Sequence, residues 1–199
     1  MSNKVAVLVS GGGRSLENLC ELQASGTLNA EIALVISSRE NAYALERASK
    51  YAIPSLTIDS TRALPPEEFS RQIFEAIEAA GCALAVLAGF LRYLPIPPEW
   101  EGRVLNIHPS LLPAFGGKGY YGDRVHAAVI ERGVKYTGCT VHYVDNVYDN
   151  GPIAVQRVID VAPTDTIETL GARVFEEEKS ALPDAVNLHF ALRQSSAEG

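Results

Sequence analysis

An amide and an imidazole stand two residues apart in the segment NIHPSLLP (residues 106–113). If the apolar residues before them form a strand, Asn106 and His108 project from the same face, because side chains alternate along a strand. Pro109 then ends that strand, since it has no N–H for the ladder. Two polar groups would thus point into the space beyond a strand end, where open α/β sheets bind ligands. Taken alone, the spacing favours a simpler interpretation, a capped strand end with a hydrogen-bonded histidine.

Further polar groups lie near the ends of later segments. His142 follows Thr140 on an alternating, strand-like stretch, so the two share a face. Asp149 lies in the turn YDNGP (residues 148–152), where it could present a carboxylate at a strand end. A turn aspartate that bonds its own backbone is the alternative for Asp149, and Asp145 is an equal rival for the same role.

A run of glycines at residues 11–13 stands between the first apolar run and the first helical pattern. The free N–H groups of a helix N-terminus can hold a phosphate, and glycines let a ligand approach the backbone closely. A tight turn with no ligand is the alternative. Leu16 occupies the place of the third glycine of a dinucleotide fingerprint, and the P-loop Lys-Ser/Thr pair is absent. The loop therefore predicts a site for a monophosphate.

Other candidates are weaker. The segment at residues 89–94 follows a buried strand and could either wall an apolar pocket or belong to the core. His126 and His189 lie among apolar neighbours in helical patterns, and we expect both to be structural. Lys118 is an anion contact or a solvated loop charge. The acidic run at residues 176–178 is typical of a solvated helix face.

The segments that must position these groups alternate between strand and helix through the first half. This pattern predicts parallel strands with crossover helices, in an α/β fold. Strands are expected at residues 5–9, 32–36, 55–58, 83–87, 103–107, 137–144 and 152–158, and helices at residues 15–24, 42–51, from 65 onward, 123–132 and 166–192. We expect one domain at residues 1–193 and a frayed polar tail at residues 194–199.

Composition narrows the class of protein. The chain has 199 residues and a net charge of −7, which disfavours a nucleic-acid partner. No signal peptide and no apolar run of membrane-spanning length are present, so we expect a soluble, cytoplasmic protein. The three cysteines have no metal-binding spacing, and free buried thiols are expected at Cys20, Cys82 and Cys139.

In chain order, the segments SGGG (residues 10–13), AGFLR (88–92), NIHPSLLP (106–113), TGCTVH (137–142) and DNGP (149–152) form a specific set. This set resembles the glycinamide ribonucleotide transformylase family, within the folate-dependent formyltransferases, over essentially the whole chain. The resemblance implies a Rossmann-like formyltransferase fold, with a mostly parallel central sheet and helices on both faces. It also implies transfer of a formyl group from the cosubstrate 10-formyltetrahydrofolate to the amine of glycinamide ribonucleotide, in de novo purine biosynthesis. No metal is implied, the partners are small molecules, and the protein would be a monomer or a homodimer.

The resemblance also implies roles for individual residues. The catalytic Asn, His and Asp of the family fall on Asn106, His108 and Asp149, with Thr140 and His142 in support. The residue that meets the glycinamide end of the substrate falls on Glu178. The phosphate loop falls on Gly11, Gly12, Gly13, Arg14 and Ser15. The folate pocket falls on Leu87, Ala88, Gly89, Phe90, Leu91, Arg92, Tyr93 and Leu94, with Val144 and Asp145.

The chain departs from the family pattern at three places. Arg14-Ser15 stands where Ser/Thr-Asn is common, Lys179 follows Glu178 where His is common, and Pro65-Pro66 stands where a basic residue is expected. Among rival activities, a methionyl-tRNA formyltransferase would have an extra C-terminal domain and a basic surface. A formyltetrahydrofolate hydrolase would usually have an N-terminal domain, and a sugar-nucleotide formyltransferase would not explain the glycine loop as well. A non-catalytic sensor of phosphorylated ligands on the same fold is the alternative of a different class.

Formyl transfer to an amine explains why such residues are needed. The reaction passes through a tetrahedral species with a developing oxyanion, which fixed hydrogen-bond donors stabilise. Asn106 supplies a neutral donor, and His108 supplies a stronger one if it is protonated, as a nearby carboxylate would favour. We expect Asp149 to take a proton from the attacking amine and His108 to protonate the leaving nitrogen of the folate.

Overall fold

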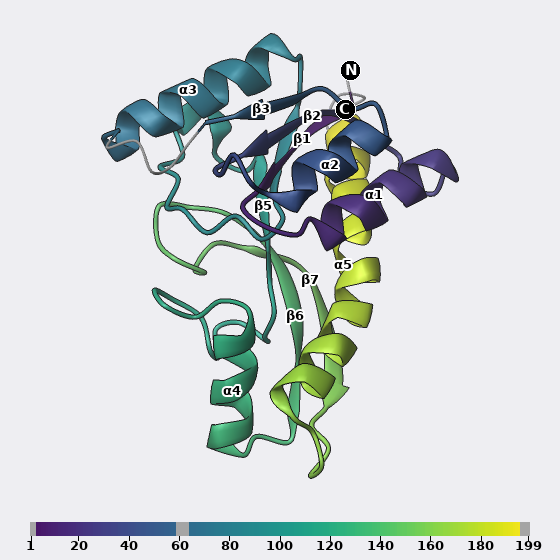
Figure 1. The fold of residues 1–199 in the computed structure, drawn as a ribbon, viewed down its shortest axis with the longest axis vertical. Helices are drawn as coiled ribbons and strands as arrows, with labels where there is room; N and C mark the ends of the chain where they lie inside the picture. Colours follow the sequence, from purple (N-terminus) through teal and green to yellow (C-terminus); the bar gives the residue numbers. More distant parts are fainter. Residues whose placement is uncertain (1–2, 59–63, 196–199) are drawn as a thin grey trace.

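A seven-stranded sheet forms the centre of the computed structural model, which describes residues 3–58 and 64–195 (Figure 1). Its strand order is β3-β2-β1-β4-β5-β6-β7. The first five strands of this order pair in parallel, and β6 and β7 are antiparallel. The strands are β1 (Lys4–Val9), β2 (Glu31–Ser37), β3 (Ser55–Thr57), β4 (Leu84–Leu87), β5 (Val104–His108), β6 (Tyr136–Tyr143) and β7 (Ile153–Asp160).

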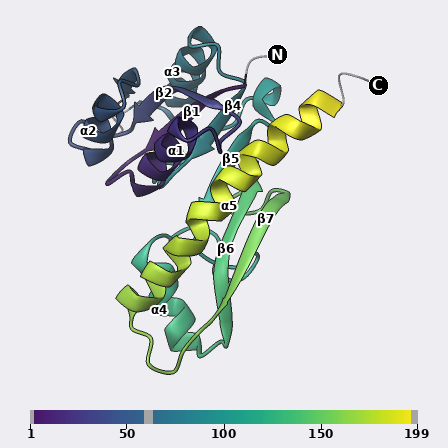
Figure 2. The same ribbon diagram turned by 90° about the vertical axis from the view of Figure 1, so that its right-hand side faces the viewer.

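Helices pack on both faces of this sheet, which confirms the predicted fold class. One face is covered by α1, α2 and α5, and the other by α3 and the short η1. Figure 2 shows α5 running along the molecule, past α1 near one end and α4 near the other. The helices are α1 (Arg14–Ala24), α2 (Tyr43–Lys50), α3 (Pro66–Ala79), η1 (Pro98–Trp100), α4 (Asp123–Arg132) and α5 (Ile167–Ser195).

The alternation of side chains along β1 explains the two hydrophobic layers. Val5, Val7 and Val9 join the layer beneath α1, α2 and α5, whereas Ala6 and Leu8 join the layer beneath α3. Because both faces are buried, the strand is an uninterrupted apolar run, as parallel strands usually are. The sheet thereby gains a dry centre, which leaves its edges and strand ends available for polar groups.

Two element boundaries differ from the predictions in ways that affect the site and the tail. The fifth strand was expected to end at residue 107, but β5 includes His108, because His108 pairs with Thr140 of β6. Helix α5 continues through Ser195, two residues into the segment expected to be frayed, and residues 196–199 lie outside the described part. No helix among the described residues is long and apolar enough to cross a membrane.

Strand register brings the candidate catalytic residues together. Asn106 of β5 pairs with Leu87 of β4 on one side and with His142 of β6 on the other. Neighbouring paired residues share a face of a sheet, so these side chains form a row across three strands. From β1 the chain continues to β2 and β3 on one side of β1, and then crosses to β4 on its other side. The boundary between β1 and β4 is therefore a topological switch point. Ligands of open α/β sheets bind at such a point.

Candidate active site

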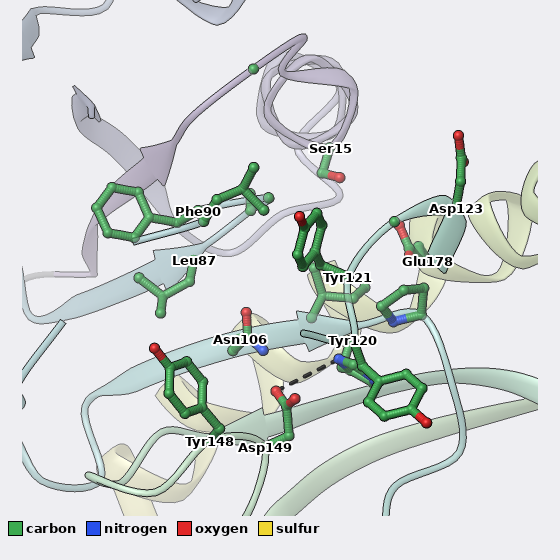
Figure 3. Close-up of a pocket in the computed structure, with 18 of the residues that line it drawn as sticks. Ser15, Leu87, Phe90, Asn106, Tyr120, Tyr121, Asp123, Tyr148, Asp149 and Glu178 are labelled. Atoms are coloured by element: carbon green, nitrogen blue, oxygen red, sulfur yellow. Dashed lines mark ion pairs between the residues drawn. The ribbon is translucent and has the colours of Figure 1, made fainter. Parts of the chain in front are cut away.

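A cavity of about 750 Å³ opens beyond the carboxyl ends of β1, β4 and β5. Figure 3 shows that Asn106 and Asp149 lie in its middle. Leu87, Phe90 and Tyr148 lie toward one end, and Ser15 and Glu178 toward the other. Every residue predicted for catalysis, phosphate binding, folate binding or substrate binding lines this cavity. The structure thus gathers segments from positions 11 to 178 into one place, while their individual roles stay predictions.

The amide of Asn106 is oriented by His142. The Nδ1–H of His142 donates to the Tyr143 carbonyl at 3.0 Å, which leaves Nε2 as the acceptor in the neutral ring. Burial is the largest influence on the pKa of His142 and lowers it, although the Tyr143 carbonyl and Asp149 oppose this effect. Asn106 Nδ2 donates to His142 Nε2 at 3.1 Å. One N–H of the amide is therefore occupied, and the other can serve a ligand.

The imidazole of His108 is held in one orientation by a backbone carbonyl. Its Nε2–H donates to the carbonyl of Phe115 at 2.8 Å, so Nδ1 is the nitrogen that faces the carboxylate of Asp149. The distance from Nδ1 to Asp149 Oδ1 is 3.6 Å. Because the proton of the neutral ring is on Nε2 and bonds the Phe115 carbonyl, Nδ1 can donate a hydrogen bond only when the ring is doubly protonated.

The carboxylates of Asp149 and Asp145, equal rivals in the sequence, have different surroundings. Asp149 Oδ1 lies 3.6 Å from His108 and 3.8 Å from His142, and Asp149 Oδ2 accepts the N–H of Gly117 at 2.8 Å. Asp145 instead accepts the N–H of Val147 and the side-chain amide of Asn150, each at 2.8 Å. Asp145 therefore maintains its own loop, as turn aspartates do, whereas Asp149 faces both imidazoles.

Thr140 lies outside the cavity and braces the chain that follows His108. Its hydroxyl donates to the Ser110 carbonyl at 2.7 Å and accepts the N–H of Leu112 at 3.0 Å. Gln156 donates to the same hydroxyl at 3.0 Å. This buried network fixes the start of the loop that provides the Phe115 carbonyl. Thr140 supports the site indirectly, through backbone geometry.

The glycine loop combines two different kinds of glycine. Gly13 has a φ of +72°, and a Cβ there would lie 2.6 Å from the Cβ of Ala44, so Gly13 permits close packing of α1 against α2. A Cβ at Gly11 or Gly12 would meet nothing within 4 Å. Open space over these two residues and an α1 N-terminus with no side-chain cap suit a bound anion. Arg47, which we did not predict, donates to the Gly12 carbonyl at 2.8 Å and steadies the loop.

The segment after β4 is both core and cavity wall. Leu87, Ala88 and Leu94 are buried in the sheet layers and also line the cavity. The hydroxyl of Tyr93 donates to the Asn146 carbonyl at 3.1 Å. Asn146 also exchanges two hydrogen bonds with the Ile96 backbone, at 2.8 and 3.1 Å. These bonds hold the 144–151 loop against the segment after β4. The sequence of the turn did not indicate this role for Asn146.

At the other end of the cavity, Glu178 lies half-buried on α5. Burial raises its pKa to about 7, although the charge of Arg14 opposes this effect. The Arg14 guanidinium lies 4.1 Å from the ring centroid of Phe175, one turn away from Glu178. The acidic run at residues 176–178 is therefore not uniformly solvated, since Glu178 points into the cavity (Figure 3).

Several cavity residues were not predicted as site residues. His126, expected to be structural, is buried but lines the cavity, and its Nδ1 has no hydrogen-bond partner among the described residues. Burial lowers the pKa of His126. Tyr120, Tyr121 and Phe175 also line the cavity. Aromatic residues within a helix or a glycine-rich loop carry no local signal that separates a site from a surface. In the described part of the chain, no cluster of three potential metal ligands occurs.

Comparisons with known proteins show the family of the chain. The sequence model of the formyl transferase family matches residues 3–186. The phosphoribosylglycinamide formyltransferase of Arabidopsis thaliana chloroplasts is 37% identical over 186 residues, which are 92% of this chain and 64% of that protein. The trifunctional purine biosynthetic protein adenosine-3 of Gallus gallus is 42% identical over 93% of this chain and 18% of its own length. The chain thus spans less than two thirds of either relative.

Solved structures resemble the chain over most of both lengths. The phosphoribosylglycinamide formyltransferase of Bacillus halodurans has a TM-score of 0.85 and 33% identity, and the match covers 96% of each chain. The glycinamide ribonucleotide transformylase 1 of Symbiobacterium toebii has a TM-score of 0.87 and 36% identity, over 94% of this chain and 87% of that one. By its sequence and its fold, the chain belongs to the formyl transferase family.

Proposed function

We propose that the protein transfers a formyl group from 10-formyltetrahydrofolate to the amine of glycinamide ribonucleotide, a step of de novo purine biosynthesis. The observation that carries this proposal is the order of groups within one cavity. Ser15, which follows the anion-suited glycine loop, lies toward one end, the apolar Leu87 and Phe90 lie toward the other, and Asn106 and Asp149 lie between them (Figure 3). Such an order suits a phosphorylated amine and an apolar, heteroaromatic donor that meet at these polar residues.

In the proposed reaction, the unprotonated glycyl amine attacks the formyl carbon and a C–N bond forms. The formyl oxygen becomes an oxyanion, which the free N–H of Asn106 and the protonated His108 stabilise. Asp149 takes the proton that the amine loses, directly or through one water. Its position 3.6 Å from His108 lets the carboxylate stabilise the imidazolium during this step.

Collapse of the tetrahedral species breaks the bond from the formyl carbon to N10 of the folate. His108 gives its Nδ1 proton to the departing N10, and Asp149 lies close enough to return a proton to His108. The products are the formylated ribonucleotide and tetrahydrofolate, and no covalent enzyme intermediate forms. Because the amine attacks unprotonated, the rate falls in acid.

The apolar wall suits the donor. Leu87 and Leu94 are buried beside the cavity, and Phe90 stacks on Phe69 at a ring distance of 6.2 Å. This wall is largely apolar, as small-molecule sites commonly are. The 144–151 loop lines the cavity beside this wall. The monomeric or homodimeric state and the cytoplasmic location stay predictions, and the Arabidopsis thaliana relative is named as chloroplastic.

A donor assay tests the proposal. Purified protein is incubated with 10-formyltetrahydrofolate, with and without glycinamide ribonucleotide, and release of tetrahydrofolate is followed. We expect release only when the amine is present, with equal formation of the formylated ribonucleotide. Release without the amine would indicate a hydrolase. Binding of the ribonucleotide with no release under either condition would indicate a sensor.

Replacement of Arg14 should weaken binding of the ribonucleotide. The Arg14 guanidinium, stacked on Phe175, lies beside the glycine loop and can add a charge-assisted hydrogen bond to the phosphate. Such a bond contributes roughly 1.5–3 kcal/mol. Arg14→Ala should therefore raise KM for the ribonucleotide by about tenfold or more, with kcat within twofold. Arg39→Ala, which removes an exposed arginine outside the cavity, is the control, and an unchanged KM in Arg14→Ala would argue against this contact.

The raised pKa of Glu178 predicts a pH-dependent stability. The unfolded chain loses this proton near the ordinary value of 4.5, whereas the folded chain keeps it up to about pH 7. Since the folded state binds the proton more tightly, Glu178 destabilises the fold progressively as pH rises from about 4.5 through about 7. The free energy of unfolding of Glu178→Gln, relative to that of wild type, should therefore rise by about 2 kcal/mol as pH goes from 5 to 8.

Urea unfolding at pH 5 and pH 8 measures this difference. Glu177→Gln, the same chemical change one residue earlier on α5, is the control. A Glu178→Gln stability difference that is the same at both pH values would show that the carboxyl does not titrate in this range.

A further inference from the structure

The carboxylate of Asp149 is held by a segment more than thirty residues earlier in the chain. The N–H of Gly117 donates to Asp149 Oδ2 at 2.8 Å, while Oδ1 faces the two imidazoles. Other residues of the 144–151 loop are bonded elsewhere: Asp145 binds Val147 and Asn150. The loop that carries Asp149 therefore does not itself fix which oxygen points toward His108.

The conformation of the earlier segment depends on two glycines. Gly117 has a φ of +97°, which an L side chain rarely adopts, and this turn aims its N–H at the carboxylate. Gly116 packs directly against Asp149: a Cβ at Gly116 would lie 3.2 Å from the Cβ of Asp149 and 2.5 Å from Cδ2 of Leu112. The backbone N–H of Leu112 donates to the Thr140 hydroxyl and its side chain is buried, so a Cβ at Gly116 would have to displace the end of that side chain, Asp149 or both.

The backbone of Asp149 adds a reason for such support. Asp149 has a φ of +52°, in the left-handed region that costs an L residue energy. A residue held in this conformation needs contacts that determine it, and such residues cluster at functional sites. The Gly117 N–H donates a hydrogen bond to the half-buried carboxylate of Asp149, and hydrogen bonds to charged groups are among the stronger kinds.

We propose that Gly116 and Gly117 are positioning residues for Asp149, which set the orientation of its carboxylate toward His108. Gly116 provides the space in which the carboxylate lies, and Gly117 provides the N–H that occupies Oδ2 and turns Oδ1 to the imidazole. This inference rests on the proposed function, in which Asp149 takes the proton of the attacking amine. Neither glycine touches the reacting atoms in this role, so their effect on the rate passes through Asp149.

A double-mutant cycle tests this inference. Gly116→Ala is measured alone and in the Asp149→Asn background, by kcat and the single-turnover rate constant, by KM for both substrates and by thermal unfolding. Alone, Gly116→Ala should lower kcat on the order of 10- to 100-fold, as displacement of a catalytic group by about 1 Å does. KM for each substrate should change by less than about threefold, since the site walls are untouched. In the Asp149→Asn background, kcat should fall by less than about twofold further, because interactions through one residue are not additive.

Gly102→Ala is the control for the general cost of replacing a glycine by alanine away from the site. Gly102 has a φ of +70°, has open space around it and lies outside the cavity. Its replacement should leave kcat within about twofold in either background, with a cost in stability alone. This control separates a general loss of stability from misplacement of the carboxylate.

A second change removes the N–H and adds no side chain. Replacement of Gly117 by glycolic acid during in vitro translation converts the amide to an ester, which deletes this donor and also makes the Gly116 carbonyl a weaker acceptor. The ester should lower kcat about tenfold in the wild-type background and have no further effect in the Asp149→Asn background. This variant keeps the inference testable if Gly116→Ala does not fold.

The outcomes distinguish the two proposals. Equal losses from Gly116→Ala and the ester in both backgrounds would overturn the positioning role and leave the role of Asp149 intact. Wild-type turnover in Asp149→Asn would overturn the proposed role of Asp149, and the positioning role with it. A loss confined to the background that retains Asp149 would support both.

Discussion

Asp149→Asn should lower kcat by roughly 10²–10⁴-fold, the range that general acid–base groups contribute. Asparagine keeps the shape of the side chain and can still accept the N–H of Gly117, so the loop should retain its conformation. It cannot accept the proton of the amine, and it no longer supplies the negative charge 3.6 Å from His108. The loss should therefore appear in kcat, with small changes in KM for both substrates. Single-turnover formyl transfer measures the loss of catalysis, and thermal unfolding checks that the fold is retained.

Asp145→Asn provides the contrast on the same loop. The carboxylate of Asp145 bonds Val147 and Asn150, so its replacement should loosen the loop at the edge of the donor pocket. We expect a raised KM for the formyl donor and a kcat within about tenfold of wild type. If Asp149→Asn retained turnover within threefold of wild type, or if Asp145→Asn were the more damaging change, the assignment of Asp149 would be wrong.

Much of the fold was predictable because buried parallel strands have a simple signature. The runs at residues 5–9 and 32–36 are apolar on both faces, and the strands β1 and β2 lie within one residue of them. Boundaries were harder where tertiary pairing decides them. His108 belongs to β5 because it pairs with Thr140 of β6, a partner thirty-two residues later that no local pattern indicates.

The site residues likewise include some that a local pattern predicts and others that depend on tertiary packing. The alternation rule placed Asn106 and His108 on one face, and both line the cavity. Only the family resemblance favoured Asp149, since the local sequence did not reveal the distinction between Asp145 and Asp149, which both lie in a turn-rich segment. The distinction depends on which carboxylate meets His108, and therefore on the path of two loops. Likewise, His126 sits in an ordinary amphipathic pattern, and only the packing of α4 against α5 brings it to the cavity.

Asn106→Leu should lower kcat by about 10²–10³-fold, the usual loss when one oxyanion donor is removed. Leucine keeps the branched shape of asparagine and would lie beside Leu87, the β4 partner of residue 106, so folding should be little affected. The special feature here is the preparation of the amide by His142, whose Nε2 accepts one N–H at 3.1 Å and leaves the other for the formyl oxygen. A donor fixed before the substrate arrives stabilises the developing charge without reorganisation.

His142→Leu tests whether this preparation matters. Without its acceptor, the Asn106 amide can rotate, and we expect a smaller loss of kcat, about tenfold, because the donor is still present. The double variant Asn106→Leu/His142→Leu should be no slower than Asn106→Leu alone, since His142 acts through the amide. A double variant slower than Asn106→Leu by a further tenfold would mean that His142 acts on the reaction by another route. The structure offers one such route, because Nε2 of His142 also lies 3.8 Å from Oδ1 of Asp149.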